Sequence, residues 1–171
     1  TAPKLAWVKK HEPEIFDQVA KVLLPKDYLR LWLCGEYVTD PSDASGTAWL
    51  NVATRTWSDE LLSACEMNRE QMPQICEGSE VSGMLRKELV QEWGMDSSVV
   101  VAGGGGDNAA SAVGMGVIDK GSAFISLGTS GVIFAANERY LPNPDSAVHA
   151  FCHALPQRWH QMGVILSATD A

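Results

Sequence analysis

A run of four glycines followed by an aspartate is the segment of this 171-residue chain whose residue types best suit chemistry. Gly103 to Gly106 follow the apolar run 98–102, and Asp107 opens a small-residue stretch that ends at Gly114. Glycines let the backbone turn sharply and let a ligand approach main-chain atoms. At a helix N-terminus, the ionised form of Asp107 gains about 0.3–1 kcal/mol, and an ionised aspartate can take a proton from a substrate hydroxyl. The local sequence leaves two interpretations of Asp107 open, a general base and a simple helix cap.

The same segment also satisfies a dinucleotide-binding fingerprint, because residues 104–109 fit G-x-G-x-x-A. Two observations weigh against that function. Asp107 would turn a negative charge toward the pyrophosphate, and the elements expected next are a connector and a hairpin rather than the second strand of a βαβ unit. Asp119 is also closer than the spacing of about 20 residues expected for a ribose-binding acid.

A second candidate site is the tetrapeptide Gly128-Thr129-Ser130-Gly131, which lies between two apolar runs. A tight glycine-bounded turn in this position predicts a β-hairpin. Its exposed N–H groups and two hydroxyls suit an anion, although an ordinary hairpin turn explains the same residues. The chain contains neither a P-loop nor a G-x-S-x-G motif, so neither a P-loop ATPase nor a serine hydrolase of the elbow type is supported.

Helical and strand patterns alternate along the chain and predict an α/β protein that positions these two sites. The corner at Asp107 reads as strand, glycine turn and helix, which is typical of ligand-binding sites in α/β proteins. The expected helices are residues 3–8, 12–23, 25–34, 58–65, 87–93 and 107–114. The expected strands are residues 47–52, 80–85, 98–102, 122–127, 132–136, 149–153 and 158–164.

Composition excludes several classes of function. The net charge is −8 and the basic residues are scattered, so we expect no nucleic-acid partner. No apolar run approaches 18 residues and the N-terminal stretch is charged, which predicts neither a membrane span nor a signal peptide. Four widely spaced cysteines predict free thiols and a cytoplasmic protein. His149, Cys152 and His153 fit no common zinc spacing, so no metal ligands are expected among them.

Several long segments together resemble the FGGY family of carbohydrate kinases. They are TAPKLAWVKKHEPEIF, VLLPKDYLRLWLCGEYVTDPSDASGTAWLNV, VVVAGGGGDNAASAVG, AFISLGTSGVIFA and AVHAFCHALPQRWHQMG. Within the family, the resemblance is strongest to the kinases that phosphorylate D-xylulose, and kinases of ribulose, glycerol or gluconate remain alternatives. A catalytically silent sugar- or nucleotide-binding module is the alternative from a different class.

The resemblance implies an actin-like ATPase fold in which two domains close over ATP and sugar. Residues 1–119 would be the later part of the first domain and residues 120–171 the start of the second. Asp107 then matches the catalytic base and Asn108 a sugar-binding position, while Gly128, Thr129 and Ser130 match a phosphate-binding hairpin. ATP and Mg²⁺ are implied as cosubstrate and cofactor, and a homodimer stays open because kinases of the family are often dimers.

The chain also departs from the family pattern. It lacks the opening Asp-x-Gly-Thr loop that handles phosphate and Mg²⁺, and the four glycines before Asp107 are one more than expected. We therefore expect a fragment of a longer kinase that has no turnover by itself, because phosphoryl transfer needs the base and the phosphate clamp together.

Overall fold

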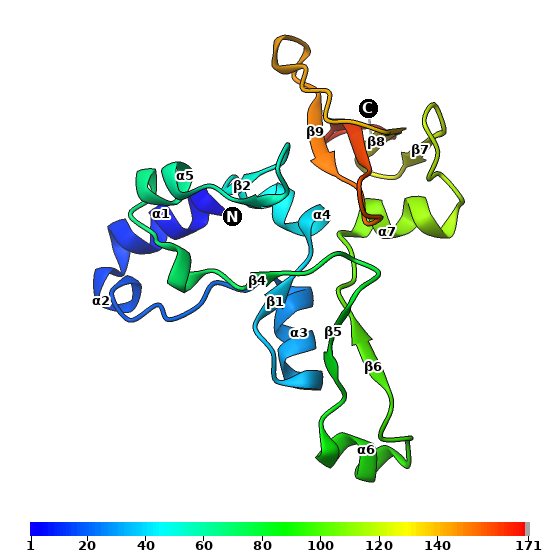
Figure 1. Ribbon diagram of the computed structural model, residues 1–171. Helices are drawn as coiled ribbons and strands as arrows, with labels where there is room; N and C mark the ends of the chain where they lie inside the picture. Colours follow the sequence, from blue (N-terminus) through cyan, green and yellow to red (C-terminus); the bar gives the residue numbers. More distant parts are fainter. Residues whose placement is uncertain (170–171) are drawn as a thin grey trace.

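The computed structural model describes residues 1–169, so the last two residues of the region predicted as 120–171 lie outside the described residues. Three arms extend from a common centre (Figure 1). The centre contains the helices α3 (Pro25–Cys34) and α4 (Pro41–Ala44) and a short parallel pair, β1 (Val38–Thr39) with β4 (Gln74–Ile75). None of the helices in the described part of the chain is long and apolar enough to cross a membrane.

The first arm contains the N-terminal helices and the larger apolar core. Its elements are α1 (Ala2–His11), α2 (Pro13–Phe16), η1 (Ser45–Thr47), β2 (Leu50–Asn51), β3 (Thr56–Trp57), α5 (Asp59–Ala64) and η2 (Arg69–Gln71). Side chains from this arm form one buried cluster, in which Trp49 and Leu62 are each only 1% exposed. Burying large apolar side chains of this kind is the main force that holds such an arm together.

Two predictions for this arm are wrong in extent. Helix α2 ends at Phe16 rather than near Leu23, because the following segment is held extended against η2: Val22 N donates to Gln71 O (2.9 Å) and Gln71 Nε2 donates to Val19 O (3.0 Å). The strand predicted over 47–52 is reduced to β2, since residues 45–47 form a 3₁₀ turn. In the first case, hydrogen bonds to a residue about 50 positions away determine a conformation that local spacing did not predict.

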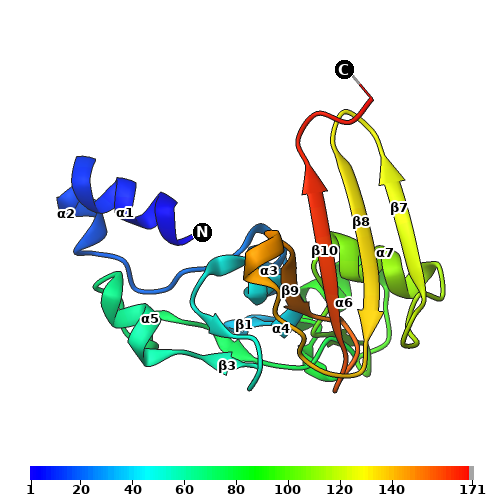
Figure 2. The same ribbon diagram turned by 90° about the horizontal axis from the view of Figure 1, so that it is seen from above.

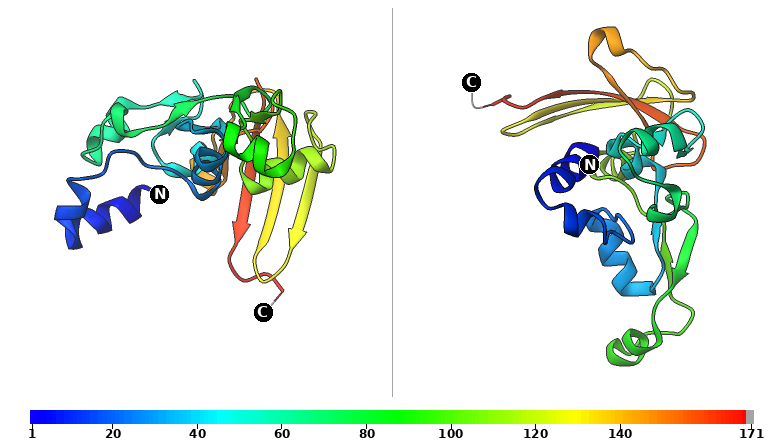
Figure 3. Two further views of the ribbon diagram at one scale, coloured as in Figure 1. Left: turned by 90° about the horizontal axis from the view of Figure 1, so that it is seen from below. Right: turned by 90° about the vertical axis from the view of Figure 1, so that its left-hand side faces the viewer.

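The second arm is a ribbon of two antiparallel strands, β5 (Val81–Met84) and β6 (Val100–Ala102), joined by helix α6 (Lys87–Trp93). Gly94 ends α6 in the left-handed conformation (φ 62°), as the sequence predicts. The ribbon projects away from the rest of the chain (Figure 3). The strand predicted over 98–102 is present as β6, but an apolar run of this kind is usually buried on both faces. Here Val100 is 50% exposed, because β6 pairs only with β5 within the described residues.

The third arm is a four-stranded antiparallel sheet. Its strands are β7 (Ala123–Leu127), β8 (Gly131–Asn137), β9 (His149–Cys152) and β10 (Trp159–Ile165), in the order β7-β8-β10-β9, and η3 (Pro144–Ser146) precedes β9. The predicted hairpin and the two predicted strands after it are therefore confirmed. Because side chains alternate along a strand, one face of β8 turns Phe134 and Ala136 inward, where they pack with Ala112 and Val117 to form a second, smaller core.

Helix α7 (Asp107–Gly114) connects the ribbon to this sheet, and Ala112 is its contribution to the second core. The predicted succession of strand, glycine turn and helix is confirmed, since β6 leads through residues 103–106 into α7. The next strand, β7, joins an antiparallel sheet, and β6 itself pairs antiparallel with β5. A dinucleotide-binding βαβ unit needs parallel strands, so the structure does not support that alternative.

The four cysteines are free, as predicted.

Candidate active site

The glycine turn before Asp107 begins so close to another backbone that no side chain fits at Gly103. A Cβ atom at Gly103 would lie 2.3 Å from the carbonyl oxygen of Glu77. Gly104 has φ +86°, a conformation that residues other than glycine rarely adopt, and its N–H donates to Gly78 O (2.9 Å). The run of glycines therefore lets the turn pack against residues 77–78, which fixes the path of the chain into α7.

A buried ion pair holds the start of this turn. Arg30, which is 4% exposed, donates from Nη1 to the carbonyl oxygen of Gly103 (3.0 Å). Its Nη2 lies 3.1 Å from Oδ1 of the fully buried Asp27. Lys26 joins the network, with Nζ 2.7 Å from Asp27 Oδ1 and 2.9 Å from Asp40 Oδ1. Burial opposes the charge on Lys26, but the two carboxylates together raise its pKa above the ordinary value.

A second connection holds the end of the turn. Asp40 is the N-cap of α4: its Oδ2 accepts from the amides of Ser42 (2.8 Å) and Asp43 (3.3 Å), and it also accepts the Ser42 hydroxyl. The Ser42 oxygen in turn accepts from the amide of Gly106 (2.9 Å). The residue immediately before Asp107 is therefore tied to α4. No local pattern in the sequence indicates this contact, because Ser42 and Gly106 are 64 residues apart.

Asp107 and Asn108 are the first two residues of α7, as predicted. Oδ1 of Asp107 accepts from the Asn108 amide N (2.7 Å) and from Asn108 Nδ2 (3.2 Å), and the Asp107 side chain is exposed. Within the described residues, Oδ2 of Asp107 accepts no hydrogen bond, so one carboxylate oxygen keeps its acceptor capacity free. That is the geometry a general base requires.

Both residues line a hollow of about 160 Å³ between the two halves of the chain. One wall comes from α4 and the start of α7, and the other comes from the sheet. The lining residues are Ser42, Asp43, Gly46, Gly106, Asp107, Asn108, Ala109, Phe151, His160 and Met162. Three of these come from β9 and β10, about 45–55 residues further along the chain, and sequence reasoning assigned none of them to the site.

Two side chains in the hollow have strongly shifted pKa values. Burial raises the pKa of Asp43 to about 6; Lys26 opposes the shift, while the carboxylates of Asp40, Asp27 and Asp107 add to it. Burial, with a smaller contribution from His153, lowers the pKa of His160 to about 3. At neutral pH, the hollow therefore contains carboxylates and an uncharged imidazole. Such shifts are common in functional sites.

The turn Gly128-Thr129-Ser130 is not part of this hollow. It lies at the tip of the β7–β8 hairpin, at the end of the sheet remote from α4 and β9 (Figure 2). All three residues are exposed, and the turn is closed by backbone contacts: Gly128 N donates to Ser130 O (2.9 Å), and Ala168 N donates to Thr129 O (2.8 Å). The structure thus places Asp107 and Asn108 in the same hollow, and the turn predicted to bind phosphate lies outside it.

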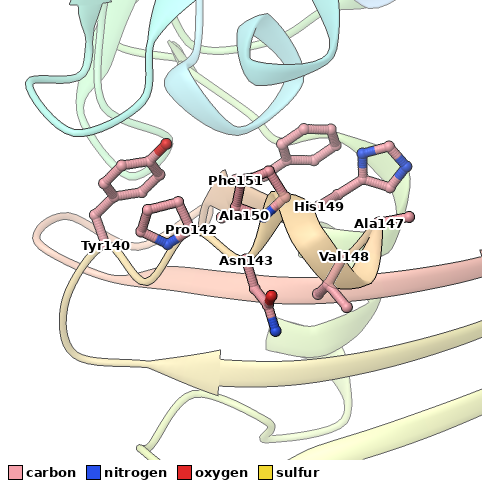
Figure 4. A pocket seen from close by; sticks show the side chains of 9 residues that line it. Tyr140, Pro142, Asn143, Ala147, Val148, His149, Ala150 and Phe151 are labelled. Carbon is pink, nitrogen blue, oxygen red and sulfur yellow. The ribbon is translucent and has the colours of Figure 1, made fainter.

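A larger hollow of about 460 Å³ lies on the outer side of Phe151, around the loop that leads into β9 (Figure 4). Tyr140, Asn143 and His149 are its polar side chains. None of the nine described residues that line it has a carboxylate. Without an acid or base of suitable strength, it is a weaker candidate for phosphoryl transfer than the smaller hollow at Asp107.

Within residues 1–169, no three acidic, histidine or cysteine side chains come together in an arrangement that could hold a metal ion. Mg²⁺ in kinases is usually held by one or two carboxylates together with substrate phosphates and water, so it does not need a cage of protein ligands.

Comparison with known proteins identifies the family. The model of the N-terminal domain of the FGGY family of carbohydrate kinases matches residues 1–114. The chain belongs to this family. Its fold is that of the FGGY kinases, an actin-like ATPase fold, as predicted. The chain spans about a third of the length of the curated relatives that it matches.

Individual relatives are similar along nearly the whole chain. A xylulose kinase from Escherichia coli (strain K12) is 62% identical over 170 residues, which are 99% of this chain and 35% of that protein. The crystal structure of a "xyloylose kinase" from Brucella ovis matches 98% of this chain and 35% of its own, with 64% identity and a TM-score of 0.97. A gluconate kinase from Lactobacillus acidophilus matches 98% of this chain and 34% of its own, with 30% identity and a TM-score of 0.89.

Proposed function

We propose that this sequence forms the catalytic-base part of an ATP-dependent kinase that phosphorylates D-xylulose to D-xylulose 5-phosphate. The observation that carries the proposal is the carboxylate of Asp107, which faces a hollow with one free oxygen at the N-terminus of a helix in a chain of the FGGY family. The names of the E. coli and B. ovis relatives favour D-xylulose as the sugar.

Asp107 would act as the general base. The sugar hydroxyl attacks the γ-phosphorus of ATP, the bond from that phosphorus to the β-phosphate oxygen breaks to release ADP, and the hydroxyl proton passes to Oδ2 of Asp107. Positioning and electrostatics supply most of the rate enhancement in such transfers. Two features of the chain serve positioning: Arg30 and Ser42 fix the turn before the base, and Asn108 Nδ2 donates to Oδ1 and so orients the carboxylate. Asn108 would also help to hold the sugar.

The turn Gly128-Thr129-Ser130 would bind the ATP phosphates through its N–H groups and its two hydroxyls. Because the turn lies away from Asp107, transfer requires the two regions to approach each other. We propose that residues 1–119 and 120–171 belong to separate domains, and the match of the family model to residues 1–114 supports a boundary near that point. The connector contains Gly116 (φ +72°) and Gly121 (φ +86°), and glycines readily absorb the backbone rotation of a hinge.

Mg²⁺ would accompany ATP, neutralising charge on the phosphates. We assign it no ligand in this chain: the described residues contain no group of three candidate ligand side chains that would mark a site. The cytoplasmic location, which the cysteines predict, stays a prediction, and the homodimer stays open.

A second candidate substrate is gluconate, because the gluconate kinase from L. acidophilus has the same TM-score and identity as the ligand-bound xylulose kinase from that organism. The test is ADP release by the full-length kinase that contains this sequence, since we expect no turnover from residues 1–171 alone. It is measured with Mg·ATP and each of D-xylulose, D-ribulose, glycerol and D-gluconate. We expect kcat/KM for D-xylulose to exceed the others by at least about tenfold, a difference of 1.4 kcal/mol. A higher kcat/KM for another of the four compounds would make that compound the substrate in place of D-xylulose. No ADP release with any of them would favour a catalytically silent binding module.

A further inference from the structure

We propose that His160 is a further substrate-binding residue: its Nδ1 forms a hydrogen bond with a hydroxyl group of the sugar that lies against Asp107. The inference rests on the proposed function and concerns a residue on the opposite wall of the same hollow, from the sheet rather than from α7.

The first observation is a buried nitrogen with no partner. His160 is 2% exposed, and its Nδ1 makes no hydrogen bond within the described residues. Polar atoms buried in a protein are nearly always paired, since leaving one unpaired costs about 1–3 kcal/mol. His153 is the instructive contrast in the same aromatic cluster: it is equally buried, but Nε2 lies 3.1 Å from Val117 O and Nδ1 accepts from Leu155 N (3.2 Å). The missing hydrogen-bond partner of His160 Nδ1 can be supplied by a ligand.

The second observation is that neighbouring side chains hold the ring in place. The His160 imidazole stacks on Phe134 with a centroid separation of 4.1 Å and an angle of 20° between the planes. It meets Phe151 edge-on at 5.9 Å, and Phe151 is also its partner across the β9–β10 ladder. A ring packed in this way loses little conformational freedom when it binds a ligand, so a single hydrogen bond contributes nearly its full free energy.

The third observation concerns the chemical class of the ligand. The hollow contains the carboxylates of Asp43 and Asp107 and no basic side chain among its described lining residues, so it disfavours an anion. The imidazole is neutral at pH 7, and a neutral imidazole offers one donor and one acceptor, which suits a hydroxyl. Phe151 and Met162 supply an apolar wall for the C–H face of a carbon chain. These features match a neutral polyhydroxy compound.

The test uses steady-state kinetics of the full-length kinase that contains this sequence, with the variants His160→Phe and His160→Asn. Phenylalanine keeps a planar ring for stacking on Phe134 but removes both nitrogens, whereas asparagine places an amide near the position of Nδ1. We expect His160→Phe to raise KM for D-xylulose about tenfold, the loss of one hydrogen bond, with KM for ATP unchanged. His160→Asn should recover part of the loss. The matched control is His149→Phe, which changes an exposed histidine outside this hollow. It should leave the KM values for D-xylulose and ATP unchanged.

A role in packing alone would lower the melting temperature and affect both substrates, so an unchanged KM for D-xylulose in a folded His160→Phe variant overturns the inference. If the variants do not fold, ¹⁵N NMR of the histidine rings of the unmodified chain decides. Adding D-xylulose without ATP should shift the Nδ1 resonance of His160 and leave that of His149 in place. If a sugar binds or is phosphorylated and the Nδ1 resonance of His160 does not shift, this inference alone is overturned. If no sugar binds and none is phosphorylated, the proposed function is overturned as well.

Discussion

The corner at Asp107 and the turn at Gly128–Ser130 are both glycine-rich and both are assigned to the same reaction, but the chain builds them in opposite ways. The corner is tied to residues far away in the sequence, through Arg30 to Gly103 and Ser42 to Gly106. The turn is exposed and depends on its own hairpin and the segment directly after β10. A base must be held at a fixed place before reaction, whereas a phosphate clamp can be completed by its ligand.

If the corner depends on its buried charges, breaking the ion pair should have a large effect. We expect Arg30→Met to lower the free energy of unfolding by about 3 kcal/mol, because it leaves the buried Asp27 with Lys26 as its remaining charged partner. Urea denaturation followed by tryptophan fluorescence measures this. Asp59→Asn, in the exposed pair with Arg69, is the control and should leave the urea midpoint unchanged. Equal effects of the two substitutions would show that the network does not hold the corner.

The close approach of the glycine turn gives the next effect. Gly103→Ala should cost about 1–3 kcal/mol of unfolding free energy, because the new methyl group would meet the Glu77 carbonyl at 2.3 Å and push the backbone away. Gly114→Ala is the matched control in α7: nothing lies within 4 Å of its Cβ position, so we expect no loss of stability. Thermal unfolding of both variants checks this. If Gly103→Ala does not lower the melting temperature, the backbone of the turn can shift to accept a methyl group at little cost.

The turn should respond differently, in ATP affinity rather than in stability. Thr129→Val removes an exposed hydroxyl at almost constant shape, so the melting temperature should not change. We expect KM for ATP to rise by up to about tenfold, the equivalent of one hydrogen bond, with KM for D-xylulose unchanged as the internal control. A lowered melting temperature with normal ATP affinity would make the turn a structural element instead.

The smallest expected effect is a dependence of stability on pH that comes from Asp43. Its folded-state pKa of about 6 lies above the ordinary value of 3.8, so its contribution to folding is fully present below about pH 4. The contribution is lost as the pH rises through 6. Allowing for partial exposure to solvent, we expect Asp43→Asn to be more stable than the unmodified chain by about 1 kcal/mol at pH 7.5. The two should be equally stable near pH 4, and urea midpoints that differ by the same amount at both pH values would contradict this origin.

The sequence predicted those features that depend on neighbouring residues. Pro25 at the start of α3 and Gly35 at its end (φ 85°), and the glycine-bounded β7–β8 turn, follow from local backbone preferences. For the same reason, the position of Asp107 at the start of α7 could be read from the glycine run before it.

Features that depend on distant residues could not be predicted in this way. Arg30 and Gly103 are 73 residues apart, and Ser42 and Gly106 are 64 apart, so no local pattern indicates either contact. The place of His160 opposite Asp107 depends on how the sheet packs on α7. The separation of the Gly128–Ser130 turn from Asp107 likewise follows from the length of the hairpin and not from the motif.

The central claim is that Asp107 takes the proton of the sugar hydroxyl from a preformed corner. The most direct test measures D-xylulose binding by calorimetry and ADP release on one preparation of the full-length kinase that contains this sequence and carries Asp107→Asn. We predict that turnover falls by about 10²–10⁴-fold, the usual contribution of a general base, while the dissociation constant for D-xylulose changes only a few-fold. Unchanged turnover would contradict the claim and leave Asp107 as a helix cap only.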